Sequence, residues 1–158
     1  MSAGAIIVLA LLVFIGITIF KGVRIVPQGY KWIVQRLGKY HTTLSPGLNF
    51  VIPYVDEVAY KITTKDIVLD IPSQEVITRD NAVLVMNAVA YINLTTPEKA
   101  VYGIENYTWA IQNLVQTSLR SIVGEMDLDD ALSSRDHIKA KLKAAISDDI
   151  SDWGITLK

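Results

Sequence analysis

The sequence contains no cysteine, only two histidines, and no charged side chain before Lys21. Without cysteine there is no disulfide, thiolate nucleophile or zinc–thiolate site, so the core depends on packing alone. The 15 basic and 16 acidic side chains leave a net charge of −1, which supplies no basic field for gripping a nucleic-acid backbone. These absences exclude thiol chemistry and disfavour nucleic acid as a partner.

Groups suited to catalysis or metal binding are sparse. The two histidines, His41 and His137, fall in different predicted elements and accompany no G-x-S-x-G turn, so we expect both at the surface. An EF-hand loop starting at Asp127 would need glycine at Leu132 and glutamate at Ile138. Helix capping is therefore the preferred interpretation of the acidic cluster Asp127, Asp129, Asp130 and Asp136. The sequence predicts no catalytic residue, metal site or cofactor.

An uninterrupted apolar run fills the N-terminus from Ala3 to Phe20. As a helix it spans about 27 Å at 1.5 Å per residue, close to a hydrocarbon core of roughly 30 Å. Its one polar side chain, Thr18, can bond back to a helix carbonyl. A cleaved signal peptide would need a basic start and a small-x-small junction, and a soluble core helix is rarely apolar on every face. We therefore predict a retained transmembrane anchor, residues 1–25. Ile25 and Val26 extend the apolar helix of Ala3 to Phe20 slightly if Lys21 and Arg24 snorkel.

The charges beside this run predict its orientation. Lys21 and Arg24 follow it directly, and no cationic side chain precedes it. Under the positive-inside rule this asymmetry places the C-terminal side in the cytoplasm. The prediction is a single-pass protein of the cell (inner) membrane, with the N-terminus outside and the domain on the cytoplasmic side.

Residues 26–158 are expected to form one domain that begins with strands. Strands are predicted at 30–37 and 39–44, flanking Gly38, and at 48–52 after a turn at 45–47. Further strands are predicted at 67–71, 74–77 and 82–94. Both faces of 82–94 are largely apolar, which predicts a strand buried on two sides beneath a covering layer.

Helical spacing supplies that layer. Apolar residues recur every three or four positions from Tyr107 to a stop at Gly124. Asp127 is expected to cap a short turn, and Ser133 or Ser134 a last helix that Gly154 stops. The final 155–158 resemble a strand that breaks off, as in a fragment of something longer. The fold class is therefore α+β, a mostly antiparallel sheet packed against helices.

A proline-bracketed apolar stretch, 46–55, lies near the anchor in sequence. Its side chains have two possible roles: to dip into the membrane interface, or to pack Leu48, Phe50 and Ile52 into the domain core. Spacing alone leaves both open.

Four blocks of the sequence stand out: QRLGKY with LSPGLNFVIP, then DIPSQEVITRDN, then TSLRSIVGEMDLD, then WGI. Together they resemble the stomatin family, whose Band 7 (SPFH) domain is expected here as a curved sheet packed on helices. They occur in family order at family spacing, and LDIPSQ is closest to the paraslipin-like branch.

The resemblance implies a non-enzymatic scaffold that forms homo-oligomeric rings or cages and organises membrane microdomains or regulates membrane proteins. It also implies membrane association by the proline-bracketed stretch, here Leu48, Phe50, Val51, Ile52, Pro53 and Tyr54. Implied partners are lipid, further copies of the chain, and possible companions such as an NfeD-family membrane protein or a membrane protease. The family's C-terminal coiled coil is absent from this sequence, so we expect the domain to be cut short at its last strand.

Contacts between copies have three candidate residues, Arg120, Glu125 and Asp129, although solvated or capping roles compete for each. Two other functions stay open. A lipid-binding module differs from the scaffold in whether Phe50 and Ile52 touch acyl chains, whereas a membrane-bound hydrolase needs a catalytic constellation that the sequence does not offer.

Overall fold

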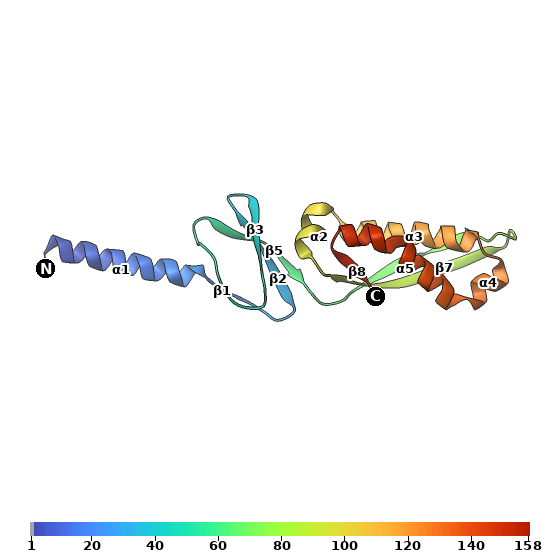
Figure 1. Ribbon diagram of the computed structural model, residues 1–158, viewed down its shortest axis with the longest axis horizontal. Helices are drawn as coiled ribbons and strands as arrows, with labels where there is room; N and C mark the ends of the chain where they lie inside the picture. Colours follow the sequence, from blue (N-terminus) through green and yellow to red (C-terminus); the bar gives the residue numbers. More distant parts are fainter. Residues whose placement is uncertain (1) are drawn as a thin grey trace. The chain divides into compact units, whose positions relative to one another are not determined.

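The computed structural model describes residues 2–158, within which it has five helices and eight strands (Figure 1). The chain divides into two compact units, the first ending at Thr64 and the second running from Lys65 to Lys158. We call them the N-terminal unit and the C-terminal unit. The predicted α+β class, with antiparallel sheets and an N-terminal apolar helix, is confirmed.

Helix α1 (Ala3–Gly22) opens the N-terminal unit. Its apolar stretch is exposed along its whole length, and by length and composition it can cross a membrane. Twenty residues give a helix of about 30 Å. As predicted, Thr18 bonds back to its own helix, its hydroxyl donating to the Phe14 carbonyl at 2.9 Å.

Helix α1 is shorter than expected at its C-terminal end. Ile25 and Val26 do not extend the helix, because they belong to strand β1 (Val23–Val26). This strand pairs antiparallel with β4 (Gly47–Phe50), with Val23 opposite Phe50 and Val26 opposite Gly47. The prediction was wrong here because strand pairing satisfies the backbone groups of residues 23–26 after the helix has ended.

A three-stranded antiparallel sheet completes the N-terminal unit. Its order is β3 (Lys39–Leu44), β2 (Tyr30–Arg36) and β5 (Asp56–Thr63). Strand β5 was not predicted, although Val58, Tyr60 and Ile62 alternate along it. The small core buries side chains from β1, β2, β3 and the segment after β4, namely Val26, Val34, Leu44 and Val51.

The C-terminal unit is built on a second antiparallel sheet, β6 (Ile67–Ile77), β7 (Val83–Leu94) and β8 (Ile155–Leu157). Strand β6 is one element where two were expected. Its register with β7 shifts between Ile71 and Gln74, around Pro72 and Ser73, so the proline is accommodated at an irregularity without ending the strand.

Four helices follow, α2 (Pro97–Gly103), α3 (Tyr107–Gly124), α4 (Leu128–Ser133) and α5 (Arg135–Asp152). Helix α3 packs on β6, and α5 packs on α3 and β8 (Figure 1). A core cluster forms between these layers from Val76, Leu119, Ile122, Val123, Ala131 and Ile138. The predicted stop of α3 at Gly124 is confirmed.

The helices cover only one face of this sheet. Along β7 the even-numbered side chains point inward, whereas Val83, Val85, Val89 and Tyr91 are 49–65% exposed. The prediction that β7 is buried on both sides was therefore wrong. The uncovered surface, which we call the outer sheet face, includes Val68, Asp70, Glu75, Ile77, Val83, Val85, Asn87, Val89 and Tyr91.

The expected caps also differ. The Asp127 carboxylate makes no capping bond to α4; it accepts two hydrogen bonds from the Arg79 guanidinium, at 2.7 and 3.1 Å. Asp80 takes the capping role instead, accepting from the Leu128 N–H at 3.3 Å. Ser134 precedes α5 without a side-chain cap. Sequence spacing cannot distinguish these arrangements, since Asp80 lies 48 positions from the helix that it caps.

Gly154 joins α5 to β8, and we expect its replacement by alanine to destabilise the C-terminal unit. Its φ is +66°, and a Cβ there would lie 2.5 Å from the Thr96 carbonyl oxygen. Left-handed strain and overpacking together predict a loss of about 2–4 kcal/mol. Gly103→Ala is the control, because only a Trp153 ring atom at 4.0 Å approaches its Cβ position. Equal thermal unfolding temperatures for the two variants would contradict the prediction.

Candidate membrane interface

The end of α1 is bound tightly to the segment that follows β4. The Val51 N–H donates to the Gly22 carbonyl at 2.8 Å. Gly22 is buried, and a Cβ on it would lie 2.6 Å from the Val51 oxygen and 3.3 Å from the Phe50 ring. Only glycine permits this close approach, so the helix and the proline-bracketed stretch meet through their backbones.

Beyond Val51 the chain turns back along α1. The Tyr54 ring stacks on the Phe14 ring, with centroids 6.3 Å apart and planes inclined by 4°. Phe14 lies eight positions before the helix end at Gly22, which corresponds to about 12 Å along the axis. The Tyr54 side chain therefore lies beside the apolar body of the helix.

Apolar side chains surround this junction without covering one another. Leu48, Phe50, Ile52 and Tyr54 are 48–73% exposed. Ile25, which is paired with Leu48 across the β1–β4 ribbon, is 70% exposed and adds to the same apolar group. Of the two roles that spacing left open, packing into the core is not observed for Leu48, Phe50 or Ile52.

Two members of the predicted membrane-associating set differ from the rest. Val51 is buried with Val26, Val34 and Leu44, so its side chain holds the loop to the N-terminal unit. Pro53 is half-buried. The positions that offer apolar surface are thus Leu48, Phe50, Ile52 and Tyr54.

One carboxylate fixes the loop at its base. Asp56 accepts two hydrogen bonds from the Arg36 guanidinium, at 2.7 and 3.1 Å, and a third from the Ile52 N–H at 3.1 Å. Its side chain is 4% exposed. The hydrogen bonds from Arg36 lower the pKa of Asp56 from its ordinary 3.8 to about 2, against the opposing effect of burial. The tip that carries Ile52 and Tyr54 is thereby held in one conformation.

Sequence reasoning missed several of these groups. Gly22, Phe14 and Asp56 each act through a partner far along the chain, and spacing carries no such information. The predicted topology charges, Lys21 and Arg24, are both exposed beside the end of α1.

The three predicted contact residues are spread over the C-terminal unit. Arg120 on α3 donates to the Gln74 side chain within the same copy at 2.9 Å. Glu125 follows α3 and Asp129 lies on α4, both exposed. No ion pair joins any of the three among residues 2–158. Both histidines, His41 and His137, are exposed on separate elements.

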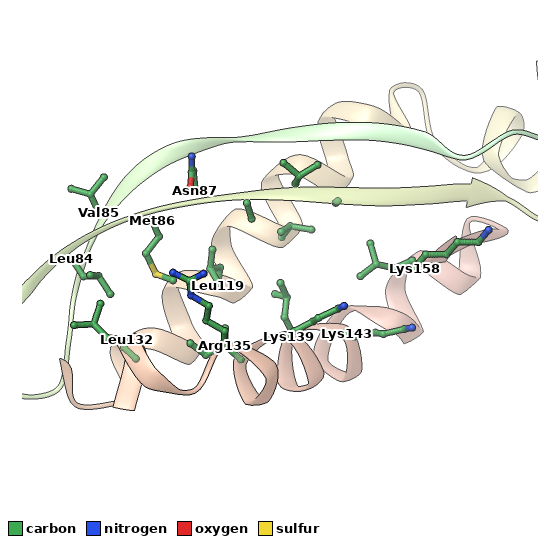
Figure 2. A pocket seen from close by; sticks show the side chains of 18 residues that line it. Leu84, Val85, Met86, Asn87, Leu119, Leu132, Arg135, Lys139, Lys143 and Lys158 are labelled. Carbon is green, nitrogen blue, oxygen red and sulfur yellow. The ribbon is translucent and has the colours of Figure 1, made fainter. Parts of the chain in front are cut away.

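The C-terminal unit also contains a groove of about 480 Å³ between β7 and α5. Leu84, Met86 and Leu119 contribute to its apolar floor. Figure 2 shows three cations, Arg135, Lys139 and Lys143, following one another along α5, which forms the wall of the groove across from β7. The groove has no nucleophile–base pair among its lining residues, and residues 2–158 hold no group of three or more metal-ligating side chains.

Comparison with known proteins gives consistent matches. The SPFH domain / Band 7 family profile matches residues 24–158. An uncharacterised protein of Methanocaldococcus jannaschii is 41% identical over 140 residues, 89% of this chain and 70% of the relative. An uncharacterised Mycobacterium tuberculosis protein is 36% identical over 97% of this chain and 40% of its own length.

A relative with a descriptive name is the mitochondrial stomatin-like protein 2 of Homo sapiens, 38% identical over 133 residues, which are 84% of this chain and 37% of that protein. The chain thus spans about two fifths of the length of the mycobacterial and human relatives.

Replacing Gly22 with alanine tests the junction. The added Cβ has to push the Val51 carbonyl or the Phe50 ring away, so we expect the N-terminal unit to lose about 1–3 kcal/mol in detergent micelles. The matched control is Gly16→Ala in the same helix, where no atom lies within 4 Å of the Cβ position. Thermal unfolding followed by circular dichroism measures both variants, and equal stability would contradict the close contact.

The Arg36–Asp56 pair predicts a pH dependence. Because the folded state lowers the pKa of Asp56, the pair stabilises fully above about pH 4 and loses this contribution as pH falls from 3.8 toward 2. Asp56→Asn removes the charge from a buried, hydrogen-bonded site, with an expected cost of about 1–3 kcal/mol at pH 7. The difference in unfolding temperature between wild type and variant is expected to shrink between pH 5 and 2. A constant difference would contradict this assignment.

Proposed function

The chain belongs to the SPFH domain / Band 7 family, and from this premise we propose that it is a membrane-anchored, non-enzymatic scaffold that assembles with copies of itself into a ring or cage. The assembly organises a membrane microdomain or regulates membrane proteins such as proteases. The observation that carries the membrane part of this proposal is the stacking of Tyr54 on Phe14.

That contact links two membrane-binding elements. If α1 spans the bilayer, Phe14 lies about 12 Å inside the helix end, within the hydrocarbon region. Tyr54 then enters the membrane beside Phe14. The exposed side chains of Leu48, Phe50 and Ile52 lie at the boundary between the lipid headgroups and the acyl chains. The hydrogen bond from the Val51 N–H to the Gly22 carbonyl holds the proline-bracketed stretch to the end of α1.

The proposed orientation rests on Lys21 and Arg24. Both are exposed at the end of α1 that continues into β1, which supports an N-terminus outside and the rest of the chain on the cytoplasmic side of the inner membrane. The proposed domain boundary remains that of residues 26–158 behind the anchor. Its partners are lipid, further copies and, by family resemblance, an NfeD-family membrane protein or a membrane protease.

A lipid-binding module without assembly is the second candidate, and the exposed apolar group around Phe50 favours it as much as it favours the scaffold. A membrane-bound hydrolase has less support. His41 and His137 are exposed side chains on separate elements, and neither lies beside a G-x-S-x-G turn.

Depth measurements in a bilayer test the membrane contact. The chain has no cysteine, so Phe50→Cys or Tyr54→Cys can carry a single environment-sensitive fluorophore. We expect quenching by lipids with spin-labelled acyl chains at both positions. Gln28→Cys is the control, because Gln28 is exposed beyond the end of β1 that points away from α1. Equal, weak quenching at all three positions would show that the stretch does not enter the membrane.

The particle mass of the full-length protein in mild detergent tests self-assembly. The scaffold predicts a large homo-oligomer, whereas a clean monomer would exclude it and leave the lipid-binding module.

A further inference from the structure

The outer sheet face carries two exposed carboxylates, Asp70 and Glu75. Asp70 lies opposite Val89 and Glu75 lies opposite Val85, so both stand among exposed valines. Neither side chain takes part in an ion pair within residues 2–158, where the three pairs are Arg36–Asp56, Arg79–Asp127 and Lys158–Asp66. An apolar surface of this extent, marked by unpaired charge, is typical of a contact site.

The first half of helix α5, on the other layer of the same unit, is mainly basic, with four cations and one aspartate, and three aspartates follow nearer its end. Arg135, Lys139 and Lys143 are exposed at intervals of four residues and line one wall of the groove (Figure 2). None of the three is in an ion pair within the described residues. Leu132, 57% exposed, precedes this row and gives it an apolar end. We call Arg135, Lys139 and Lys143 the α5 basic row, and Leu132 lies beside it at the end of α4.

The two surfaces match in spacing. Asp70 and Glu75 are set by their partners Val89 and Val85, four residues apart on β7, which corresponds to about 13 Å. Arg135 and Lys143 are eight residues apart on one helix, which corresponds to about 12 Å. The two carboxylates and the two cations therefore have nearly the same separation along their elements.

We propose that the outer sheet face of one copy binds the α5 basic row of the next copy. This inference rests on the proposed scaffold and identifies its interface. The sheet and the helices form opposite layers of the C-terminal unit, so the two surfaces cannot meet within one copy. Each copy then has one acidic face and one basic face, and this heterologous contact forms a ring when its rotation closes.

Charge argues against the symmetric alternatives. Two outer sheet faces packed together would place Asp70 and Glu75 against carboxylates of equal charge, and two basic rows would repel in the same way. A head-to-tail contact pairs opposite charges and covers the exposed valines at the same time, which gives it both specificity and apolar burial.

Cysteine crosslinking tests the contact in membranes that hold the whole protein. Val85→Cys marks the outer sheet face and Ala140→Cys marks the surface beside Lys139, and both positions are exposed. Membranes containing both single-cysteine copies are expected to give a dimer with a short bis-maleimide, whereas either copy alone is not. Asp149→Cys replaces Ala140→Cys in the control mixture, since it lies about 14 Å further along α5.

Charge reversal provides the second arm. In one experiment both cysteine copies carry D70K/E75K, and in a second both carry R135E/K143E. We expect each to lower the crosslink yield at least about tenfold, because like charges then face each other. A mixture of the two reversed forms restores the yield, because opposite charges meet again. D148K/D149K is the control for altered charge, and circular dichroism confirms that each variant folds.

The outcomes separate the two proposals. An unchanged crosslink yield after charge reversal, or crosslinks from Val85→Cys copies alone, would exclude this interface while a large wild-type particle mass keeps the scaffold. Loss of the particle itself would exclude the scaffold. If anionic lipid abolishes the crosslink, the α5 basic row binds anionic vesicles in preference to a second copy. That outcome would also overturn the inference.

Discussion

The hydrogen bond from the Val51 N–H to the Gly22 carbonyl is the constraint on which the N-terminal unit depends. It ends α1, starts the pairing of β1 with β4, and places the loop that carries Ile52 and Tyr54 against the helix. The contact is possible only because residue 22 has no Cβ. A backbone contact of this kind has few alternative geometries, so the exposed apolar side chains around it have defined positions.

The same short stretch contains both a buried side chain and exposed ones. Val51 is buried and joins the core, whereas its neighbours Phe50 and Ile52 are exposed. Asp56 fixes the far end of the loop through Arg36. Exposing large apolar side chains to water gains nothing for folding, and their retention next to an apolar helix is consistent with a membrane surface as their natural environment.

The C-terminal unit has a similar asymmetry. Its helices cover one face of the sheet, and the other face presents valines with Asp70 and Glu75 among them. A two-layer unit always leaves one sheet face to solvent or to a partner. The cations Arg135, Lys139 and Lys143 lie on the helical layer of the same unit, away from that face.

Much of the chain could be predicted from sequence, because local patterns carry the information. The apolar run that forms α1, the alternation along β7 and the three-to-four spacing of α3 each specify an element without reference to distant residues. The family resemblance rests on blocks of the same local kind, and the family match over residues 24–158 confirms it.

What the sequence determined by itself was therefore the existence and type of most elements, the apolar N-terminal helix and the family. The tertiary structure decided where that helix ends, which aspartate caps α4, and which face of β7 is covered. Each of these depends on a contact between residues far apart in sequence. Burial is a property of the neighbours that a side chain meets, and both faces of an apolar strand look alike until packing selects one.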